Sequence, residues 1–304
     1  MPHIYAIGET VLDIIFENDI PVSACVGGSM LNSAVSLGRM HLPVSMITGI
    51  GMDKPGLITN NFLEKNGVDN SMVKQYPDTK TTIALAFLDD QKKAFYEFYQ
   101  QQPTEQAFWA VPAFKPGDLL LFGSVFSLRP YMRPYITQTL EAAIQANVCS
   151  LYDPNFRTAH LHDLESLKPA IFDNMIKASI VRGSDEDFAL ICGLSDPDEI
   201  YTFVSQYCQN LLITRGPEEV LVYTSGIKKR YAVPTLSAVS TIGAGDSFNA
   251  GLLYGLFHII NEKGTIPLLS EQDWDTIVSV AIACASAVCL SPENYVPVNF
   301  KPEN

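Results

Sequence analysis

The chain has 304 residues, of which 47% are hydrophobic and 17% charged, enough apolar material to fill a sizeable core. Its formal net charge of −13 argues against broad binding to nucleic acid or to an anionic membrane surface. Because it has no apolar run of about 18 residues and no basic-then-apolar leader, we expect a cytoplasmic protein without a membrane partner.

Short apolar runs alternate along the chain with segments of helical periodicity. Strands are predicted at 4–7, 44–48, 119–122, 148–152, 179–181, 210–213 and 219–223, and helices at 32–40, 133–146 and 199–209. Strands that alternate with helices indicate an α/β fold, with a mainly parallel sheet covered by helices on both faces. We expect one Rossmann-type domain over residues 1–304.

Two segments break this alternation. Residues of about 12–26 and 81–101 are extended and have no intervening helix, and the second is rich in aromatic side chains. They do not fit the main sheet, so we expect them to contribute the strands of a small separate β-sheet. An ordinary surface hairpin is the alternative.

A pair of glycines opens the helix predicted near the N-terminus. Gly27 and Gly28 allow a ligand to approach the backbone closely, and Asn32, one turn into the helix, offers a donor and an acceptor to a polyol. The alternative for this segment is purely structural, with Ser29 capping the helix and Asn32 solvated.

A second glycine turn, Gly243-Ala244-Gly245, delivers Asp246 to the predicted start of a long apolar helix. The first turn of a helix has unpaired N–H groups and a partial positive charge, so this turn can hold the oxygens of a phosphoryl group. Asp246 can then accept the proton of an attacking hydroxyl. Alternatively, Asp246 only caps the helix.

The two glycine segments, in this order and about 210 residues apart, resemble the paired signatures of the ribokinase-like PfkB carbohydrate kinases. Further ordered matches to that family lie at 49–56, 152–157 and 213–216. The resemblance implies a doubly wound α/β sheet with a small β lid over the sugar. It also implies transfer of the ATP γ-phosphate to a sugar hydroxyl. In this family the lid often forms a homodimer interface as well.

The resemblance also assigns roles to residues. Asp246 is implied as the catalytic base, with Gly243, Ala244 and Gly245 as the oxyanion hole. Asp13, Gly27, Gly28 and Asn32 match the sugar side of the family pattern. Arg157 matches a residue that reaches either the sugar or the phosphate.

The nucleotide side has no Gly-x-x-x-x-Gly-Lys-Ser/Thr loop. The resemblance places Thr214 and Gly216 near the nucleotide, and Ser184 and Asp187 where the family has Asn-x-x-Glu. We expect Mg²⁺ with ATP, held by Asp187 or by the neighbouring Glu186. Ser184 and Asp187 also match a helix capping box, and both roles are compatible.

Ser240 departs from the family pattern, which has an aspartate that helps to bind a monovalent cation. A serine hydroxyl carries no negative charge to offset K⁺. We therefore expect weak or absent activation by K⁺.

The sugar is predicted from the extended segments, which resemble the lid strands of fructokinases. Where the family has an arginine, this chain has Gln100-Gln101-Gln102, which favours a neutral ketose over a sugar acid. Fructose is the predicted substrate. The alternatives are a kinase for 2-keto-3-deoxygluconate or another sugar or nucleoside, and a non-catalytic sugar- or nucleotide-binding regulator.

Overall fold

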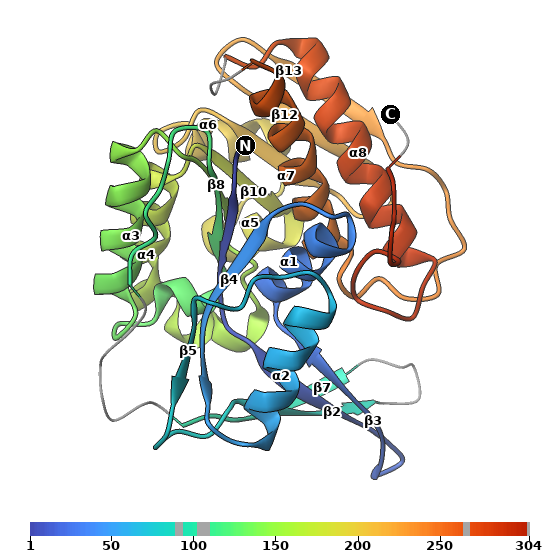
Figure 1. Ribbon diagram of the computed structural model, residues 1–304. Helices are drawn as coiled ribbons and strands as arrows, with labels where there is room; N and C mark the ends of the chain where they lie inside the picture. Colours follow the sequence, from blue (N-terminus) through green and yellow to red (C-terminus); the bar gives the residue numbers. More distant parts are fainter. Residues whose placement is uncertain (89–93, 102–109, 264–267, 303–304) are drawn as a thin grey trace.

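The computed structural model describes residues 1–88, 94–101, 110–263 and 268–302 (Figure 1). Within these residues the main sheet has the strand order β13-β12-β11-β10-β9-β8-β1-β4-β5. In chain order its strands are β1 (Ile4–Ile7), β4 (Val44–Gly51), β5 (Val73–Tyr76), β8 (Leu119–Gly123), β9 (Cys149–Asp153), β10 (Ile180–Ser184), β11 (Leu211–Thr214), β12 (Glu219–Tyr223) and β13 (Lys228–Ala232). Every strand predicted from the sequence is present, with ends that differ by up to three residues.

The strands from β5 to β11 across the sheet are parallel, and β12 and β13 add an antiparallel hairpin at one edge. From β1 the chain winds outward to β4 and β5, then crosses to β8 and continues in the other direction. The strand order therefore reverses between β1 and β8. In open α/β sheets, ligands bind at the carboxyl ends of the strands beside such a reversal.

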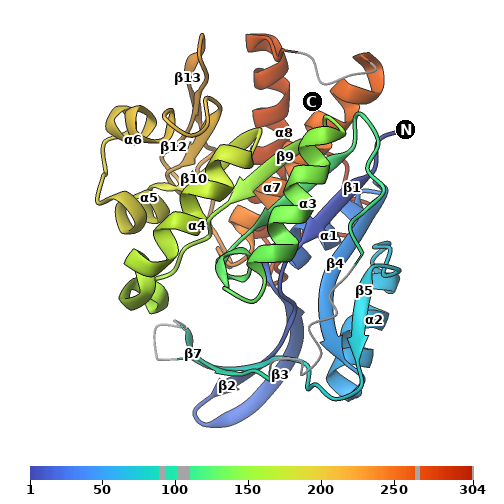
Figure 2. The same ribbon diagram turned by 90° about the vertical axis from the view of Figure 1, so that its left-hand side faces the viewer.

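Helices cover both faces of the main sheet (Figures 1 and 2). Side chains of α1 (Ser29–Arg39), α2 (Lys54–Lys65), α7 (Ala244–Lys263) and α8 (Glu271–Cys289) enter one cluster of buried hydrophobic residues. Those of α3 (Arg133–Gln145), α4 (Leu164–Lys177), α5 (Asp185–Cys192) and α6 (Pro197–Val204) enter the other. This arrangement confirms the predicted α/β fold. No helix in the described residues is both long enough and apolar enough to cross a bilayer.

The helix predicted at 199–209 is shorter than expected and ends at Val204. Beyond it, the N–H of Gln206 bonds to the carbonyl of Phe203 and that of Tyr207 to the carbonyl of Val204. These three-residue bonds tighten the chain into a turn, so it leaves the helical path before Gln209.

A second sheet lies below the main one, with the strand order β3-β2-β6-β7 (Figure 2). Its strands are β2 (Val11–Glu17), β3 (Ile20–Gly27), β6 (Ile83–Leu88) and β7 (Ala94–Tyr99). The predicted separate β-sheet is thus present, and we call it the lid. Residues 89–93 of the predicted segment, and Gln102 beyond it, lie outside the described residues.

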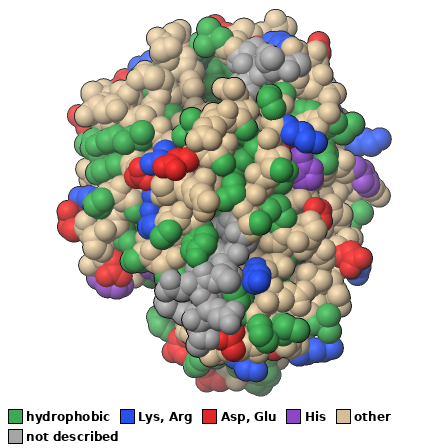
Figure 3. Space-filling view, turned by 60° about the vertical axis from the view of Figure 1, so that its left-hand side comes forward, with side chains coloured by type: hydrophobic (Ala, Val, Ile, Leu, Met, Phe, Trp, Pro, Cys, Tyr) green, Lys and Arg blue, Asp and Glu red, His purple; other side chains and the backbone are tan. Residues whose placement is uncertain are grey.

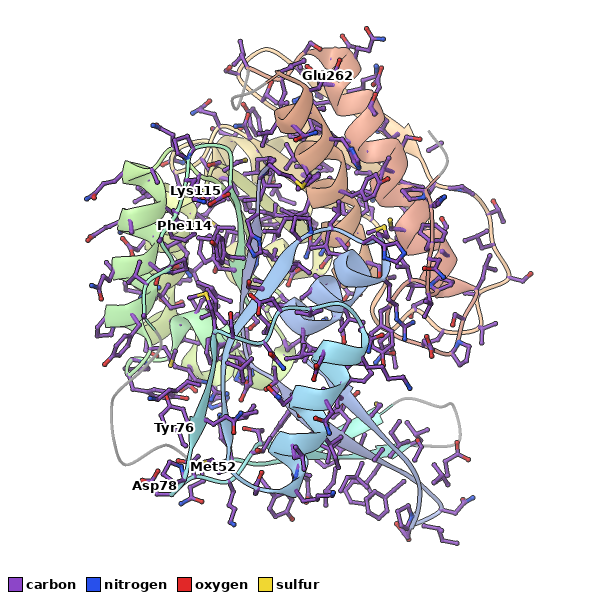
Figure 4. All side chains as sticks on the ribbon, viewed as in Figure 1. Met52, Tyr76, Asp78, Phe114, Lys115 and Glu262 are labelled. Carbon is purple, nitrogen blue, oxygen red and sulfur yellow. The ribbon has the colours of Figure 1, made fainter. Side chains whose placement is uncertain are left out.

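The lid lies at the carboxyl-end edge of the main sheet. Met52, Tyr76 and Asp78, which follow or end β4 and β5, lie at the lid end of the molecule in Figure 4, whereas Glu262 near the end of α7 lies at the opposite end. Helix α7 therefore starts near the lid and runs away from it. Figure 3 shows acidic and basic side chains scattered among hydrophobic and polar ones on one face of the molecule.

Candidate active site

The glycine turn before α7 is held in place by a neighbouring loop. Gly243 has φ +80°, and a Cβ at this position would lie 2.1 Å from the backbone oxygen of Asn294. The hydroxyl of Ser240 accepts the N–H of Ile242 at 3.2 Å. Helix α7 begins at Ala244, which confirms the predicted helix start. Its first N–H groups therefore open toward the carboxyl-end edge with their partial positive charge.

Asp246, in the first turn of α7, is 9% exposed and is held by side chains of α1. Its Oδ1 accepts the hydroxyl of Ser29 at 2.6 Å and its Oδ2 the amide of Asn32 at 2.8 Å. Burial raises the pKa of Asp246 to about 6, and the two hydrogen bonds oppose that rise. The carboxylate is thus directed away from its own helix and toward α1, which is not the geometry of a simple helix cap.

Helix α1 presents a row of small polar residues to the start of α7. Besides Ser29 and Asn32, Ser33 donates to the backbone oxygen of Asp246 at 2.8 Å, and the hydroxyls of Ser36 and Ser247 are 3.2 Å apart. Positions 29, 32, 33 and 36 share one face of a helix. The structural alternative from the sequence is wrong, because the N-cap is Gly28, its cap has no side-chain hydrogen bond, and Asn32 is 5% exposed.

Asp13 lies in the lid strand β2, opposite Cys25 of β3. A Cβ on Gly27 would lie 2.5 Å from Oδ2 of Asp13, so the glycine leaves room for this carboxylate. Burial alone raises the pKa of Asp13 to about 6, and no described residue donates a hydrogen bond to it. Gly28 has φ +133° and abuts the backbone oxygen of Glu9. The lid therefore contributes an acceptor-only group beside the glycine pair.

Arg157 follows β9 and is exposed. Its charge lowers the pKa of Asp246 on one side and opposes the burial-driven rise in the pKa of Tyr96, a lid residue, on the other. Tyr96 also feels the charge of Asp13. Arg157 is therefore close enough to influence both the start of α7 and the lid.

A buried polar network beneath the glycine turn was not predicted from the sequence. Arg182 of β10 donates to Oδ2 of Asp153 at 2.9 Å and to the hydroxyl of Thr214 at 2.7 Å. Asn249 of α7 donates to the same Asp153 oxygen at 2.6 Å. A Cβ on Gly245 would lie 3.1 Å from the guanidinium of Arg182. A cation inside an otherwise apolar strand was the available signal, because buried charges need partners.

This network accounts for the position of Thr214 at the end of β11. Its hydroxyl accepts from Arg182, so it is tied to the base of α7. Gly216, two residues later, has φ +52° and nothing within 4 Å of the place where a Cβ would lie. The two residues predicted for the nucleotide therefore flank the same edge of the sheet, with open space at Gly216.

Ser184 and Asp187 form the predicted capping box at the start of α5. Oδ2 of Asp187 accepts both the N–H and the hydroxyl of Ser184, and Oδ1 accepts the N–H of Phe156 at 2.6 Å. Burial, followed by the charge of Asp153, raises the pKa of Asp187. Neighbouring Glu186 is exposed.

These carboxylates fit Mg²⁺ only as minor ligands. The described residues contain no group of three or more histidine, cysteine or acidic side chains placed to hold a metal ion. Mg²⁺ in kinases is commonly bound by one or two carboxylates, water and the phosphates of the nucleotide. Protein donors occupy both oxygens of the buried Asp187, so the exposed Glu186 is the more accessible of the two carboxylates for that limited role.

Gln100, just after β7, joins the lid to the end of β1. It donates to Oε1 of Glu9 at 2.8 Å, and Arg129 donates to Oε2 of the same carboxylate at 3.0 Å. Burial raises the pKa of Glu9, and Arg129 opposes that rise. A small cavity of about 50 Å³, lined in part by Tyr76 and Tyr131, lies beside this contact. The hydrogen bond from Gln100 to Glu9 thus links the lid to the main sheet.

Comparisons with known proteins agree with this geometry. The family model described as "pfkB family carbohydrate kinase" matches residues 1–299. Fructokinase of Escherichia coli is 29% identical over 93% of this chain and 92% of its own length. Aminoimidazole riboside kinase of Salmonella typhimurium is 23% identical over 84% of this chain and 81% of its own length.

Two solved structures have the same fold. A fructokinase double mutant from Vibrio cholerae O395, in a form with fructose, ADP and potassium ion bound, superposes with a TM-score of 0.83 at 20% identity, covering 97% of this chain and 94% of that one. Aminoimidazole riboside kinase from Salmonella enterica, complexed with aminoimidazole riboside and an ATP analogue, superposes with a TM-score of 0.82 at 20% identity, covering 98% and 97%.

Proposed function

The chain belongs to the pfkB family of carbohydrate kinases, and from this membership we propose that it phosphorylates a neutral ketose, fructose, with ATP. The family and the fructokinase relatives make it a phosphotransferase that acts on an alcohol group of a sugar. The observation that carries the proposal is the buried carboxylate of Asp246 at the start of α7, facing the glycine segment of α1.

Asp246 is the proposed general base. Its carboxylate accepts the proton of the sugar hydroxyl as that oxygen attacks the γ-phosphorus in line. The N–H groups at Gly243, Ala244 and Gly245 stabilise the charge on the phosphoryl oxygens, and the guanidinium of Arg182 beside Gly245 adds positive potential there. The base and the anion site therefore share one helix terminus.

The sugar is proposed to lie between α1 and the lid. Asp13 accepts hydrogen bonds from its hydroxyls, Asn32 and the backbone at Gly27 and Gly28 line its other side, and Arg157 lies at the junction with the phosphate. Asp13 suits a neutral polyol because a carboxylate only accepts hydrogen bonds.

The nucleotide is proposed to extend along the carboxyl ends of β10 and β11, past Ser184, Thr214 and Gly216. Bound Mg²⁺ would neutralise charge on the phosphates, with Asp187 and Glu186 as its protein ligands. The open space at Gly216 leaves the backbone accessible at this position.

Neutral sugars are favoured over sugar acids by the position of Gln100. Gln100 stands where the family has an arginine; it is neutral and donates to Glu9. Arg129 nearby is already paired with the same carboxylate. A substrate carboxylate in this corner would meet Glu9 instead of a free cation. Aminoimidazole riboside is the second candidate, because a kinase for it matches in both sequence and fold.

The test is ATP consumption with Mg²⁺ on fructose, tagatose, ribose, 2-keto-3-deoxygluconate, adenosine and aminoimidazole riboside. We expect turnover on fructose, and the Asp246→Asn variant should fold normally but lose about two or more orders of magnitude in kcat. Turnover on another compound would keep the mechanism and replace the sugar. Nucleotide binding without turnover on any of the six would support a non-catalytic binding protein.

A further inference from the structure

Ser29 makes a contact that its position in α1 does not require. It is the first residue of the helix, one position after the cap, and the cap residue Gly28 has no side chain to bond the helix end. The hydroxyl of Ser29 instead reaches across 217 residues of sequence and donates to Oδ1 of Asp246 at 2.6 Å. The side chain of Ser29 therefore bonds to the carboxylate of Asp246 and not to its own helix.

The two oxygens of Asp246 lie in different surroundings. Oδ2 is held by Asn32, which is 5% exposed, and Oδ1 by Ser29, which is half-buried. The Ser29 side is thus the more open one, through which a hydroxyl group of a substrate can reach the carboxylate. A carboxylate oxygen has room for a second donor beside Ser29.

From this geometry we propose that Ser29 is a positioning residue, whose hydroxyl fixes the Oδ1 edge of Asp246 and keeps the carboxylate ionised. The proposal rests on the proposed role of Asp246 as the base of a sugar kinase. Without the Ser29 hydroxyl, the buried carboxylate keeps only the amide of Asn32 as a side-chain donor. A buried charge with fewer donors takes up a proton more readily.

The other charges around Asp246 act in opposite directions. Asp153, at the end of β9, raises its pKa, and Arg157, in the loop that follows, lowers it. Arg182 of β10 lies beside Gly245, but its guanidinium donates to Asp153. From α1, the groups that face the carboxylate are the hydroxyl of Ser29 and the amide of Asn32. Removing Ser29 therefore removes a specific donor and leaves these charges in place.

The chain provides a matched control in Ser33. It has the same side chain, lies one turn further along α1, and donates to the same residue at 2.8 Å, but to the backbone oxygen of Asp246. Ser33→Ala and Ser29→Ala each remove one bond between α1 and α7. Only Ser29→Ala removes a donor from the carboxylate.

The experiment measures kcat/KM against pH for the wild type, Ser29→Ala, Ser29→Thr and Ser33→Ala. We expect Ser29→Ala to lose about tenfold in kcat/KM on the acidic limb, because its Asp246 is protonated at a higher pH, with KM for the sugar little changed at high pH. Ser29→Thr keeps a hydroxyl and should restore the wild-type limb. The limb of Ser33→Ala should coincide with that of the wild type.

The same carboxylate can be titrated without turnover. The carboxyl carbons of ¹³C-labelled aspartate are followed by NMR, and the Asp246 signal is identified by its loss in Asp246→Asn. The signal in Ser29→Ala should titrate at a higher pH than in the wild type. An unmoved signal, or an equal shift in Ser33→Ala, would overturn the positioning role. Absence of wild-type turnover would instead overturn the proposed function, and the NMR titration would still decide the role of Ser29.

Discussion

Arg182 and Asp153 form a buried ion pair directly beneath the start of α7, with the guanidinium nitrogen 2.9 Å from the carboxylate oxygen. Asp153 is fully buried and Arg182 is 6% exposed. The pair joins the ends of β9 and β10, and Thr214 and Asn249 extend it to β11 and α7. The ends of three adjacent parallel strands are thus tied to the helix that carries Asp246.

Replacing Arg182 by methionine should destabilise the protein strongly. The variant leaves the carboxylate of Asp153 buried without its cation, which costs about 3 kcal/mol in the free energy of unfolding. Urea denaturation measures this cost. The control is Arg230→Met, because Arg230 is 60% exposed and its pair with Glu219 is long at 3.5 Å, so its loss should cost less than about 1 kcal/mol.

The double variant Asp153→Asn with Arg182→Met should lose less stability than the sum of the two single variants, because it leaves no unpaired charge. Equal stability of Arg182→Met and Arg230→Met would show that the pair is not required for the fold.

The pH profile of kcat/KM should fall with a slope approaching two below about pH 6. In the proposed mechanism Asp13 and Asp246 must both be ionised, and burial raises the pKa of each to about 6. Protonation on the acid side of this value therefore removes both functions together. In Asp13→Asn the limiting slope should fall to one. A slope of one in the wild type would mean that one of these carboxylates is not needed in its ionised form.

Two glycines with positive φ, Gly243 before α7 and Gly216 after β11, differ in how closely the protein packs around them. Gly216→Ala should cost about 1 kcal/mol, since its φ of +52° is unfavourable for alanine but nothing lies near the new Cβ. Gly243→Ala should cost about 3 kcal/mol and reduce kcat about 100-fold, because its Cβ would meet the backbone oxygen of Asn294 and shift the turn. Thermal unfolding measures the loss of stability in each variant, and steady-state kinetics measures its kcat. Equal effects would contradict the close packing at Gly243.

K⁺ should stimulate turnover only weakly or not at all, compared with a bulky organic cation. Ser240, where the family has an aspartate, offers only a hydroxyl, and that hydroxyl accepts the N–H of Ile242. It provides no charge for a monovalent cation. Ser240→Asp should gain activation by K⁺. A large stimulation of the wild type by K⁺ would contradict this prediction.

The outer surface of the lid should mediate a homodimer. Phe95 and Tyr99, which share the face of β7 opposite to that of Asp13, are 66% and 59% exposed, and Ile20 and Val22 of β3 are also exposed. Apolar side chains gathered on one element commonly mark an interface. Light scattering after gel filtration should give twice the chain mass for the wild type and the chain mass for Phe95→Ser. Leu161→Ser, an exposed residue in a short helix between β9 and α4, is the control. A monomeric wild type would refute the dimer.

The fold was largely predictable because its signals are local. Apolar strands such as Leu119–Gly123 and the helical periodicity of α7 come from neighbours in sequence, and the glycine turn marked the helix start at Ala244. The lid was predictable as extended chain, but its pairing of β2 with β6 brings together segments that no local pattern connects.

The sequence indicated the carboxylate and the glycines of the candidate site, but not the contacts that hold them in place. Ser29 matched a helix cap, and only the packing of α1 against α7 directs its hydroxyl to Asp246. Arg182 follows the strand predicted at 179–181, and its partner Asp153 lies on the neighbouring strand, so no local pattern connects the two. Such contacts depend on the three-dimensional arrangement of distant segments.

The bond between Ser29 and Asp246 also has a consequence for biosynthesis. A ribosome adds about 5–20 residues per second, so the 217 residues that separate the two partners take roughly 10–40 s to synthesise. During that time the apolar side chains of α1 lack α7, with which they share a core. The nascent chain therefore carries the proposed sugar-side segment long before the proposed catalytic base exists, and we expect neither a truncated chain nor an early folding intermediate to transfer phosphate.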